Sequence, residues 1–375
     1  MARKKSRPRA AKRAVTGPRP AGGPAPRPTN IAKVVIFFME NHTTDNVASE
    51  VAGVNGNKAL AVAPDVVVPD PPHDHGHWNV RKTPAPGGAR RERFTAAQLP
   101  NLYKLMNEFT VCDNYFSDFA GNSFPNHCFA IGADAEWAYA NPGHRYTVSI
   151  ATAGVPARLA KAGKTWANYG KGFAFAHYKD PQMHASVKAS AQFLVDARAG
   201  KLPNVSWVYA PPGQDFHPGP LGFGSSMKAS DGWLGAAVDA VRQSPDWAAS
   251  MIFITFDDWG GWDDHVDPPN VEQFTAGSPW PGEQYRYGSR VPCVVVGPFA
   301  KGRACLPRTL VPCESRRVHR ASLESAAVSQ PGRRATHNSR QRDGGLLHDV
   351  IQTFADQRAG VVPRHNPTTS DEFRA

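Results

Sequence analysis

Five short runs of mostly apolar residues recur along the chain and define its hydrophobic pattern. They cover residues 31–39, 109–115, 205–209, 251–256 and 291–296. Nearly continuous apolar runs of this length are typical of strands buried on both faces of a parallel sheet. The sequence therefore predicts a set of core strands, of which 205–209 has the weakest pattern.

Helical spacing appears between these predicted strands. Alternation of strands and helices favours an α/β fold, with helices on both faces of one sheet. The second helical pattern should stop at Pro245, because proline cannot continue a helix. The apolar positions with helical spacing are Leu102, Leu105, Met106 and Phe109 in the first segment and Leu234, Val238 and Val241 in the second.

Charge changes the picture at the two ends of the chain. Residues 1–30 contain nine Lys or Arg and no acid, and their Pro and Gly content predicts a disordered basic tail. Residues 302–343 contain nine Arg against three acids. Of the total charge of +11, residues 31–301 carry −3. This mildly acidic body does not favour nucleic-acid binding, so a nucleic acid would have to bind the basic ends.

The cysteines and the hydropathy of the chain indicate where in the cell the protein is expected. The five cysteines include no CxxC pair, which predicts reduced thiols instead of a disulfide framework or a zinc ribbon. The basic start is followed by a Pro-rich stretch and not by an apolar segment, so we expect a cytoplasmic protein. No run approaches the roughly 18 apolar residues of a membrane helix, and no transmembrane segment is expected.

Oxygen-bearing side chains follow two of the predicted strands. Glu40 and Asn41 come after the first run, and Asp257 and Asp258 come after the fourth. Ligands bind outside the carboxyl ends of strands in open α/β sheets. Carboxylate and amide oxygens favour Ca²⁺, Mg²⁺ or Mn²⁺, without excluding Zn²⁺. The sequence therefore predicts a site for one divalent metal ion, with a pair of solvated turns as the alternative.

A serine precedes a predicted helix in the segment GNSFPNH. Ser123 suits a helix N-cap, and Pro125 suits the first turn. Backbone N–H groups at a helix start favour a phosphate, and a metal ion or base can activate a hydroxyl as a nucleophile. Ser123 is therefore a candidate nucleophile, with an ordinary N-cap as the alternative.

Histidines are concentrated in one short segment. His73, His75 and His77 lie within five residues, and His217 is isolated. Histidine is a natural proton donor to a leaving oxygen near neutral pH. The alternating segment HDHGH could equally form a zinc site on a loop or a solvated turn.

Segments including VVIFFMENHTTDN, DPPHDHGHW, GNSFPNH and DDWGGWDDHVDPP occur in one order over residues 33–302. Together they resemble a family of phosphoesterases that includes bacterial phospholipases C and acid phosphatases, within the alkaline-phosphatase-like superfamily. The resemblance implies a three-layer α/β/α sandwich and hydrolysis of phosphate esters. It leaves the alcohol part of the substrate open between a phospholipid headgroup, a small monoester and a nucleotide.

The resemblance also implies roles for individual positions. One divalent metal ion and a serine nucleophile would perform the reaction, and a histidine would protonate the leaving alcohol. His265 would take a supporting role. The matching positions are Glu40, Asn41, Asp257 and Asp258 for the metal ligands, Ser123 for the nucleophile, and His73 and His217 for histidines that line the phosphate pocket.

The resemblance ends near residue 303. An Arg- and Ser-rich texture without helix or strand periodicity replaces the apolar helix expected there. We hypothesise a change of reading frame at this point, which the other two frames of the DNA would reveal. The predicted organisation is a basic tail (1–30), a catalytic domain (31–302) and an atypical segment (303–375). A folded but inactive relative is therefore an alternative. Sulfate-ester hydrolysis is disfavoured, because GNSFPN lacks the arginine of a CxPSR-like segment.

Overall fold

The computed structural model describes residues 31–84, 86–132, 135, 137–141, 154–170, 184–219, 225–300 and 305–310, the last six as backbone only. The predicted basic tail and nearly all of the predicted atypical segment lie outside these residues. Within them, no helix is long and apolar enough to cross a membrane.

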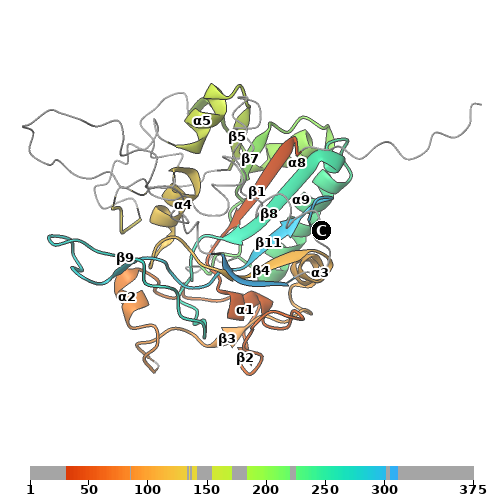
Figure 1. Cartoon of the computed structure of the whole chain (residues 1–375). Helices are drawn as coiled ribbons and strands as arrows, with labels where there is room; N and C mark the ends of the chain where they lie inside the picture. The colour runs from red at the N-terminus through yellow and green to blue at the C-terminus, as the bar shows by residue number, and fades with distance from the viewer. Residues whose placement is uncertain are drawn as a thin grey trace, which may run out of the picture.

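One eight-stranded sheet forms the centre of the described structure (Figure 1). Its strand order is β12-β4-β11-β8-β1-β7-β5-β6, and all neighbouring strands are parallel except that β11 is antiparallel to both β4 and β8. The predicted, mostly parallel sheet is confirmed. The strands are β1 (Lys33–Met39), β4 (Thr110–Tyr115), β5 (Trp166–Tyr169), β6 (Val187–Lys188), β7 (Val205–Val208), β8 (Ser250–Phe256), β11 (Cys293–Val296) and β12 (Cys305–Leu310).

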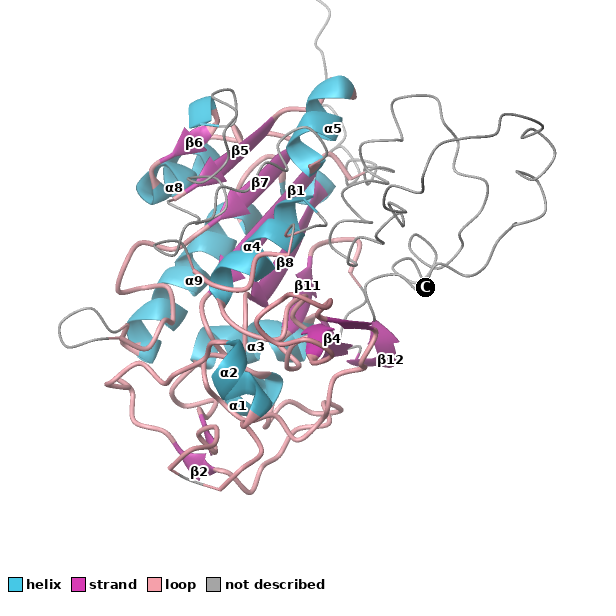
Figure 2. Ribbon diagram, turned by 90° about the vertical axis from the view of Figure 1, so that its left-hand side faces the viewer, coloured by secondary structure: helices cyan, strands magenta, loops and turns pink. Residues whose placement is uncertain are grey.

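Helices cover both faces of this sheet, which confirms the predicted three-layer sandwich (Figures 1 and 2). On one face, α9 packs against both α3 and α8. On the other face, α4 packs against α5. The five helices are α3 (Pro100–Glu108), α4 (Ser123–Gly132), α5 (Val155–Lys161), α8 (Ser190–Arg198) and α9 (Met227–Arg242).

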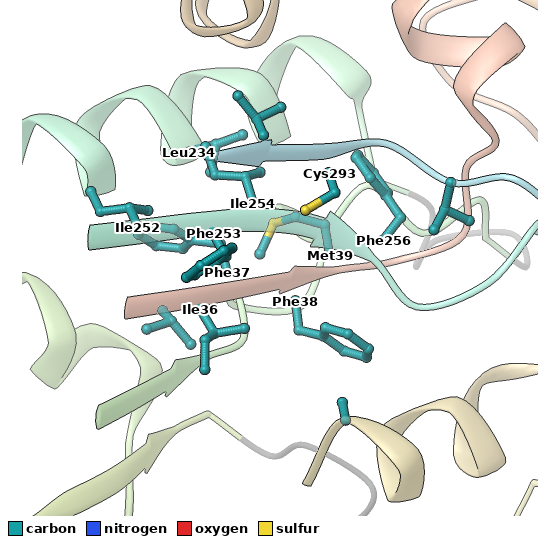
Figure 3. Close-up of a cluster of buried hydrophobic side chains, with 14 of the residues drawn as sticks. Ile36, Phe37, Phe38, Met39, Leu234, Ile252, Phe253, Ile254, Phe256 and Cys293 are labelled. Carbon is teal, nitrogen blue, oxygen red and sulfur yellow. The ribbon is translucent and has the colours of Figure 1, made fainter. Parts of the chain in front are cut away.

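The two central strands explain how the core places the site. All seven residues of β8 and six of the seven in β1 are buried, since helices cover the sheet on both sides. Figure 3 shows their side chains, among them Phe37 and Ile254, packed within this core. The strands pair in parallel from Lys33–Ser250 to Met39–Phe256. Their carboxyl ends therefore lie side by side, and the polar residues that follow them emerge together.

Short elements surround the carboxyl ends of β1 and β8. The strands β2 and β3 form a parallel pair, and β9 and β10 form an antiparallel pair. These elements are α1 (Thr44–Ala48), β2 (Ala61–Val62), α2 (His75–Asn79), β3 (Glu92–Arg93), β9 (Glu272–Gln273) and β10 (Gln284–Arg286), and a single 3₁₀ turn, η1 (Trp247–Ala249), precedes β8.

Strand β12 lies in the segment after residue 302, where the sequence shows no strand periodicity. Cys305–Leu310 pairs in parallel with β4 at the edge of the sheet. Its register shifts between Leu306 and Thr309, on either side of Pro307. Proline lacks the N–H group that a central strand needs, but an edge strand tolerates it. A propensity argument underestimates such a strand, because the neighbouring strand supplies its stability.

Candidate active site

The ends of β1 and β8 are joined by one carboxylate oxygen. Oδ1 of Asp257 accepts hydrogen bonds from the backbone N–H of Asn41 at 2.9 Å and of Asp258 at 2.8 Å. Asn41 adopts a left-handed backbone conformation with φ of 60°, which turns the chain sharply after the strand. The other oxygen of Asp257, Oδ2, is left facing the interior of the site.

Asp258 is held in the same manner. Its Oδ1 accepts a hydrogen bond from the Gly260 N–H at 2.7 Å, and its Oδ2 accepts one from Ser123 Oγ at 3.0 Å. Gly260 has φ of +58°, and a Cβ atom there would lie 2.2 Å from the Asn41 carbonyl oxygen. The turn after β8 therefore requires glycine. Each aspartate has one oxygen bound by backbone and one directed into the site.

Ser123 is the first residue of α4, and its side chain is 1% exposed. The hydroxyl donates to Asp258, and Asn141 Oδ1 accepts from the Phe124 N–H at 2.9 Å. The predicted cradle of helix N–H groups is thus smaller than expected, since Phe124 is engaged and Pro125 has no N–H group. The predicted proximity of serine and aspartates is nevertheless observed across the sheet edge.

The side-chain amide of Asn41 connects the carboxylates to two histidines. One of the two terminal atoms of this amide, its oxygen or its nitrogen, lies 3.0 Å from Asp257 Oδ1 and 3.2 Å from Glu40 Oε2. The other lies 3.1 Å from Nε2 of both His73 and His217. With the amide nitrogen toward the carboxylates and its oxygen toward the histidines, all four contacts are hydrogen bonds. The structure therefore brings all seven predicted site residues together.

His127 joins this site, although the sequence interpretation did not include it. Its side chain is fully buried on α4, one turn after Ser123. Nε2 lies 3.3 Å from Asp257 Oδ2 and 3.6 Å from Glu40 Oε1. Residues four apart share one face of a helix, so the spacing between Ser123 and His127 was the available signal. We call Glu40, Asn41, Ser123, His127, Asp257 and Asp258 the carboxylate site.

Burial and mutual charge set the protonation of this site. Burial, and next the charge of Asp257, raises the pKa of Glu40 to about 7. The same two causes raise the pKa of Asp258 well above its usual value. Burial opposes the ionisation of Asp257 and His127, but their contact outweighs it, so the pKa of Asp257 falls to about 2 and that of His127 rises to about 9.

These residues fit a divalent metal ion. Three buried or largely buried carboxylates, Glu40, Asp257 and Asp258, converge, and His127 is the cation in direct contact with two of them. Burial and, after it, repulsion by Asp257 raise the pKa values of Glu40 and Asp258, and a dication would relieve this repulsion. Glu40, His127 and Asp257 each offer a ligand atom within 4.8 Å of the others. Carboxylate and His groups are thus placed to hold a metal ion.

The three clustered histidines do not converge on one point. His73 alone contacts the site, through Asn41. His75 is buried with Nδ1 2.6 Å from the Ala120 carbonyl oxygen, and the exposed His77 pairs with Asp74. Because these rings point to different partners, the described structure does not support a zinc site formed by the HDHGH segment.

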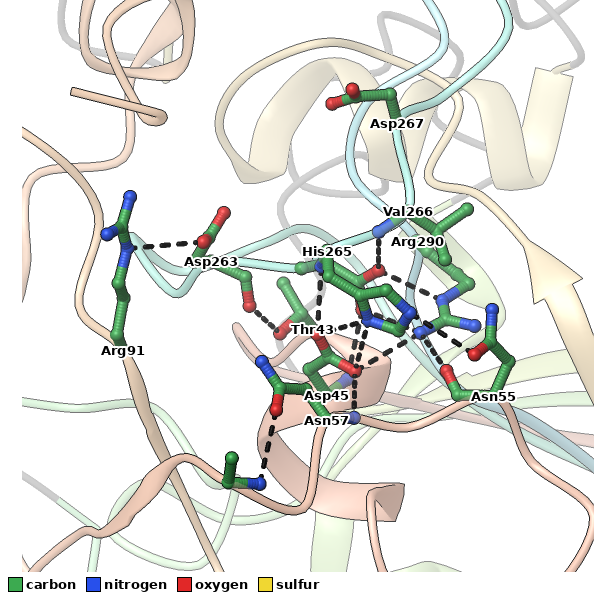
Figure 4. Close-up of polar contacts among 12 residues, drawn as sticks. Thr43, Asp45, Asn55, Asn57, Arg91, Asp263, His265, Val266, Asp267 and Arg290 are labelled. Carbon is green, nitrogen blue, oxygen red and sulfur yellow. Dashed lines mark hydrogen bonds and ion pairs between the residues drawn. The ribbon is translucent and has the colours of Figure 1, made fainter.

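A second group of acids surrounds Arg290, and Figure 4 shows Arg290 with Asp45 and His265 of this group. The fully buried guanidinium of Arg290 donates from Nε to Asp264 Oδ1 at 3.0 Å, from Nη1 to Asp113 Oδ1 at 3.1 Å and from Nη2 to Asp45 Oδ1 at 3.3 Å. His265 Nδ1 lies 2.8 Å from Asp45 Oδ2. His265 therefore contacts Asp45 and not the predicted metal ligands. We call these five residues the arginine cluster.

Comparison with known proteins identifies the family. Residues 66–310 match the model of the Phosphoesterase family. The chain belongs to this family, as its motifs predicted. The match continues past residue 303, at which the resemblance was expected to end, and reaches the last residue of β12.

Curated relatives of the chain are phospholipases C. Phospholipase C A of Mycobacterium tuberculosis (strain ATCC 25618 / H37Rv) is 26% identical over 252 residues, covering 56% of this chain and 47% of the relative. Non-hemolytic phospholipase C of Burkholderia pseudomallei is 24% identical, covering 73% and 52%. Non-specific phospholipase C3 of Arabidopsis thaliana is 24% identical, covering 55% and 42%. The chain spans about half the length of the curated relatives it matches.

Among solved structures, a protein in the alkaline phosphatase superfamily from Vibrio parahaemolyticus is similar, with a TM-score of 0.38 and 14% identity over 72% of this chain and 60% of that one. A murine ectonucleotide pyrophosphatase / phosphodiesterase 5 has a TM-score of 0.35 and 14% identity, covering 60% and 56%.

Proposed function

We propose that this chain hydrolyses phosphate esters, with Ser123 as the nucleophile and one divalent metal ion at the carboxylate site. The observation that carries this proposal is the 3.0 Å hydrogen bond from Ser123 Oγ to Asp258 Oδ2. This hydrogen bond places the hydroxyl at the start of α4 against a carboxylate that follows β8. In a member of the Phosphoesterase family, this pairing supplies both a nucleophile and an acceptor for its proton.

The proposed reaction has two steps. Ser123 Oγ forms a bond to phosphorus, its proton passes to Asp258 Oδ2, and the bond from phosphorus to the alcohol oxygen breaks. Water then attacks phosphorus, the bond to Ser123 Oγ breaks, and a proton of the water returns to Ser123 Oγ, which releases phosphate from a monoester substrate or a phosphate monoester from a diester substrate. A metal ion held by Glu40, Asp257 and Asp258, and by Asn41 once its amide rotates to turn the oxygen toward these carboxylates, would stabilise negative charge on the reacting oxygens.

The leaving alcohol needs a proton, and His217 is the better placed of the two predicted donors. Burial lowers the pKa of His217, but the charges of Glu40 and Asp70 outweigh it, so the net pKa lies above the usual value. A larger share of His217 is therefore protonated near neutral pH than of an ordinary histidine. His73 reaches the same Asn41 amide and is the second candidate donor.

The substrate class follows from the relatives and not from the site alone. Phospholipase C relatives favour a phospholipid, which is a phosphodiester, whereas the acid phosphatase resemblance favours a monoester. The full chain should therefore be assayed with aryl phosphate monoesters, aryl phosphodiesters and phospholipid vesicles. Each assay should include chelation by EDTA and restoration with single metal ions. An inactive relative would show a cooperative melt and no turnover of any substrate.

Ser123→Ala tests the nucleophile. We expect turnover to fall at least about a thousandfold, because the nucleophile accounts for most of the lowering of the activation barrier. Ser117→Ala is the matched control, because Ser117 is also buried but its hydroxyl donates to the backbone carbonyl oxygens of Phe119 and Ser289. Phosphoserine trapped at residue 123 by acid quench would support the assignment. Wild-type turnover by Ser123→Ala would overturn it.

A further inference from the structure

The carboxylate site contains a nitrogen donor that the expected all-oxygen ligand set lacks. We propose that His127 Nε2 is a direct metal ligand, so that the site prefers Zn²⁺ or another late first-row ion to Ca²⁺ and Mg²⁺. This inference rests on the metal dependence in the proposed function. It adds a ligand to that site and replaces the metal preference drawn from the oxygen donors alone.

The distances between donor atoms carry the first part of the argument. Ligands that lie about 2.0–2.2 Å from a zinc-like ion are separated from one another by roughly 3.0–3.5 Å. His127 Nε2 lies 3.3 Å from Asp257 Oδ2 and 3.6 Å from Glu40 Oε1. Asp257 Oδ2 is the oxygen that its two backbone N–H contacts leave free to face the site. One ion can therefore contact His127 Nε2 and Asp257 Oδ2 with little movement, and Glu40 offers a third ligand atom within 4.8 Å of both residues' ligand atoms.

The setting of the imidazole ring carries the second part. His127 Nδ1 lies 3.3 Å from the Tyr209 hydroxyl oxygen. The ring stacks on Tyr209 at a centroid distance of 5.3 Å and meets Phe38 edge-on at 4.8 Å. These contacts fix the ring with Nε2 toward the carboxylates. A polar partner on the second ring nitrogen is the usual support of a metal-bound histidine.

The helix supplies the third part. His127 follows Ser123 by four residues, so α4 presents the hydroxyl and the imidazole on one face. Both reach carboxylates that directly follow β8: Ser123 contacts Asp258, and His127 contacts Asp257. The helix that brings the nucleophile therefore brings a ligand as well.

The donor set determines the choice of metal. Ca²⁺ and Mg²⁺ bind almost entirely through oxygen, whereas imidazole suits Zn²⁺, Fe²⁺ and Ni²⁺. A histidine that served only as a counter-charge to Glu40 and Asp257 would give the opposite result, because removing a cation would strengthen the binding of every dication.

The test compares metal affinity in the stripped full chain, independently of activity. Competition with chelators gives the affinity for Zn²⁺ and Co²⁺, and calorimetry gives that for Mg²⁺. Co²⁺ absorption reports the ligand set. In His127→Gln we expect the affinity for Zn²⁺ and Co²⁺ to fall at least about 100-fold. Changes to residues that only hydrogen-bond to a metal ligand already lower metal affinity roughly 10–100-fold. The Mg²⁺ affinity should change less than about threefold. His75→Gln is the matched control, since His75 is also fully buried but faces the Ala120 carbonyl oxygen.

A second variant covers the case in which His127→Gln does not fold. Tyr209→Phe keeps the stacking ring and removes the hydroxyl beside Nδ1, and should weaken Zn²⁺ binding about tenfold. If the wild type binds a dication but neither folded variant alters the Zn²⁺ affinity or the Co²⁺ spectrum, the inference is wrong and the proposed function stands. If the wild type binds no dication, the metal dependence in the proposed function fails, and the inference fails with it.

Discussion

The carboxylate site and the arginine cluster each gather three buried or largely buried acids, yet they balance the charge differently. In the arginine cluster, the guanidinium of Arg290 donates to all three carboxylates. In the carboxylate site, His127 contacts two acids, and the third accepts a serine hydroxyl. The side chain of Arg290 balances the charge of the arginine cluster, so this cluster is a structural element. In the carboxylate site, carboxylate oxygens face one another, and this arrangement is suited to binding a metal ion.

The arginine cluster also positions the carboxylate site. Asp45 follows β1 in α1, Asp113 lies in β4, and Asp264 lies in the loop after β8. The segments that carry Asp45 and Asp264 are those that carry Glu40 and Asp258. One buried arginine therefore links the two loops that form the site, as Figure 4 shows for Asp45 and Arg290.

The sharpest way to separate the two groups is Asp257→Asn. We expect loss of bound metal and at least about a thousandfold loss of turnover, because metal stabilisation of the reacting oxygens contributes several kcal/mol. The melting temperature of the metal-free protein should fall less than in a variant that lacks Arg290, since the change removes the pairing of Asp257 with His127 but also its repulsion of Glu40 and Asp258. Metal analysis, steady-state kinetics and a thermal melt check these points. Unchanged metal content in the variant would contradict the assigned ligand.

Arg290→Met should have the opposite profile. Removing the guanidinium leaves Asp45, Asp113 and Asp264 buried without their cation, and breaking such a group costs about 3–5 kcal/mol. Denaturant unfolding of the metal-free protein measures the loss. Arg91→Met is the control, because Arg91 pairs with Asp263 while its side chain is 50% exposed. Equal losses in the two variants would mean that the arginine cluster does not stabilise the fold.

Metal addition should stabilise only chains with an intact carboxylate site. At a free metal concentration about 100-fold above Kd, the folded protein gains about 2.7 kcal/mol. The wild type and Arg290→Met should both show a higher melting temperature with metal, and Asp257→Asn should not. An equal shift in all three proteins would place the bound metal outside the carboxylate site.

The smallest expected effect separates close packing from backbone strain. Gly260→Ala places a Cβ atom 2.2 Å from the Asn41 carbonyl oxygen, whereas Gly163→Ala, at φ of +66°, meets nothing within 4 Å. Both carry about 1–2 kcal/mol of left-handed strain. Gly260→Ala should lose about 1 kcal/mol more and bind metal more weakly. Paired denaturant melts measure the difference, and identical values would show that the turn after β8 adapts freely.

The sequence was sufficient for the parts of the site that follow continuous apolar strands. The runs ending at Met39 and Phe256 form neighbouring strands in parallel register, so Glu40 and Asp257 lie together as predicted. The direction of each strand relative to its neighbours could not be predicted, because the apolar run that forms the antiparallel strand β11 resembles the runs of the parallel strands.

Residues set by non-local packing escaped the sequence interpretation. His127 lies in a helix whose ten residues are all buried, so no polar face marks it as exceptional. Arg290 resembles a charged flank of an apolar run, and its partners lie far away in the chain, at residues 45, 113 and 264. Such pairings depend on how the loops meet, and no local pattern encodes that.

The left-handed backbone of Asn41 has a consequence for comparing distant sequences. Position 41 must satisfy the backbone, which admits chiefly glycine, asparagine and aspartate at φ of 60°. In the proposed function it must also offer an oxygen to a metal ion, which glycine does not. A homologue with glycine at this position would keep the turn and lose the ligand, while a β-branched residue would indicate a rebuilt loop. Under the proposed function, position 41 therefore separates family members that can bind the metal ion from members that cannot.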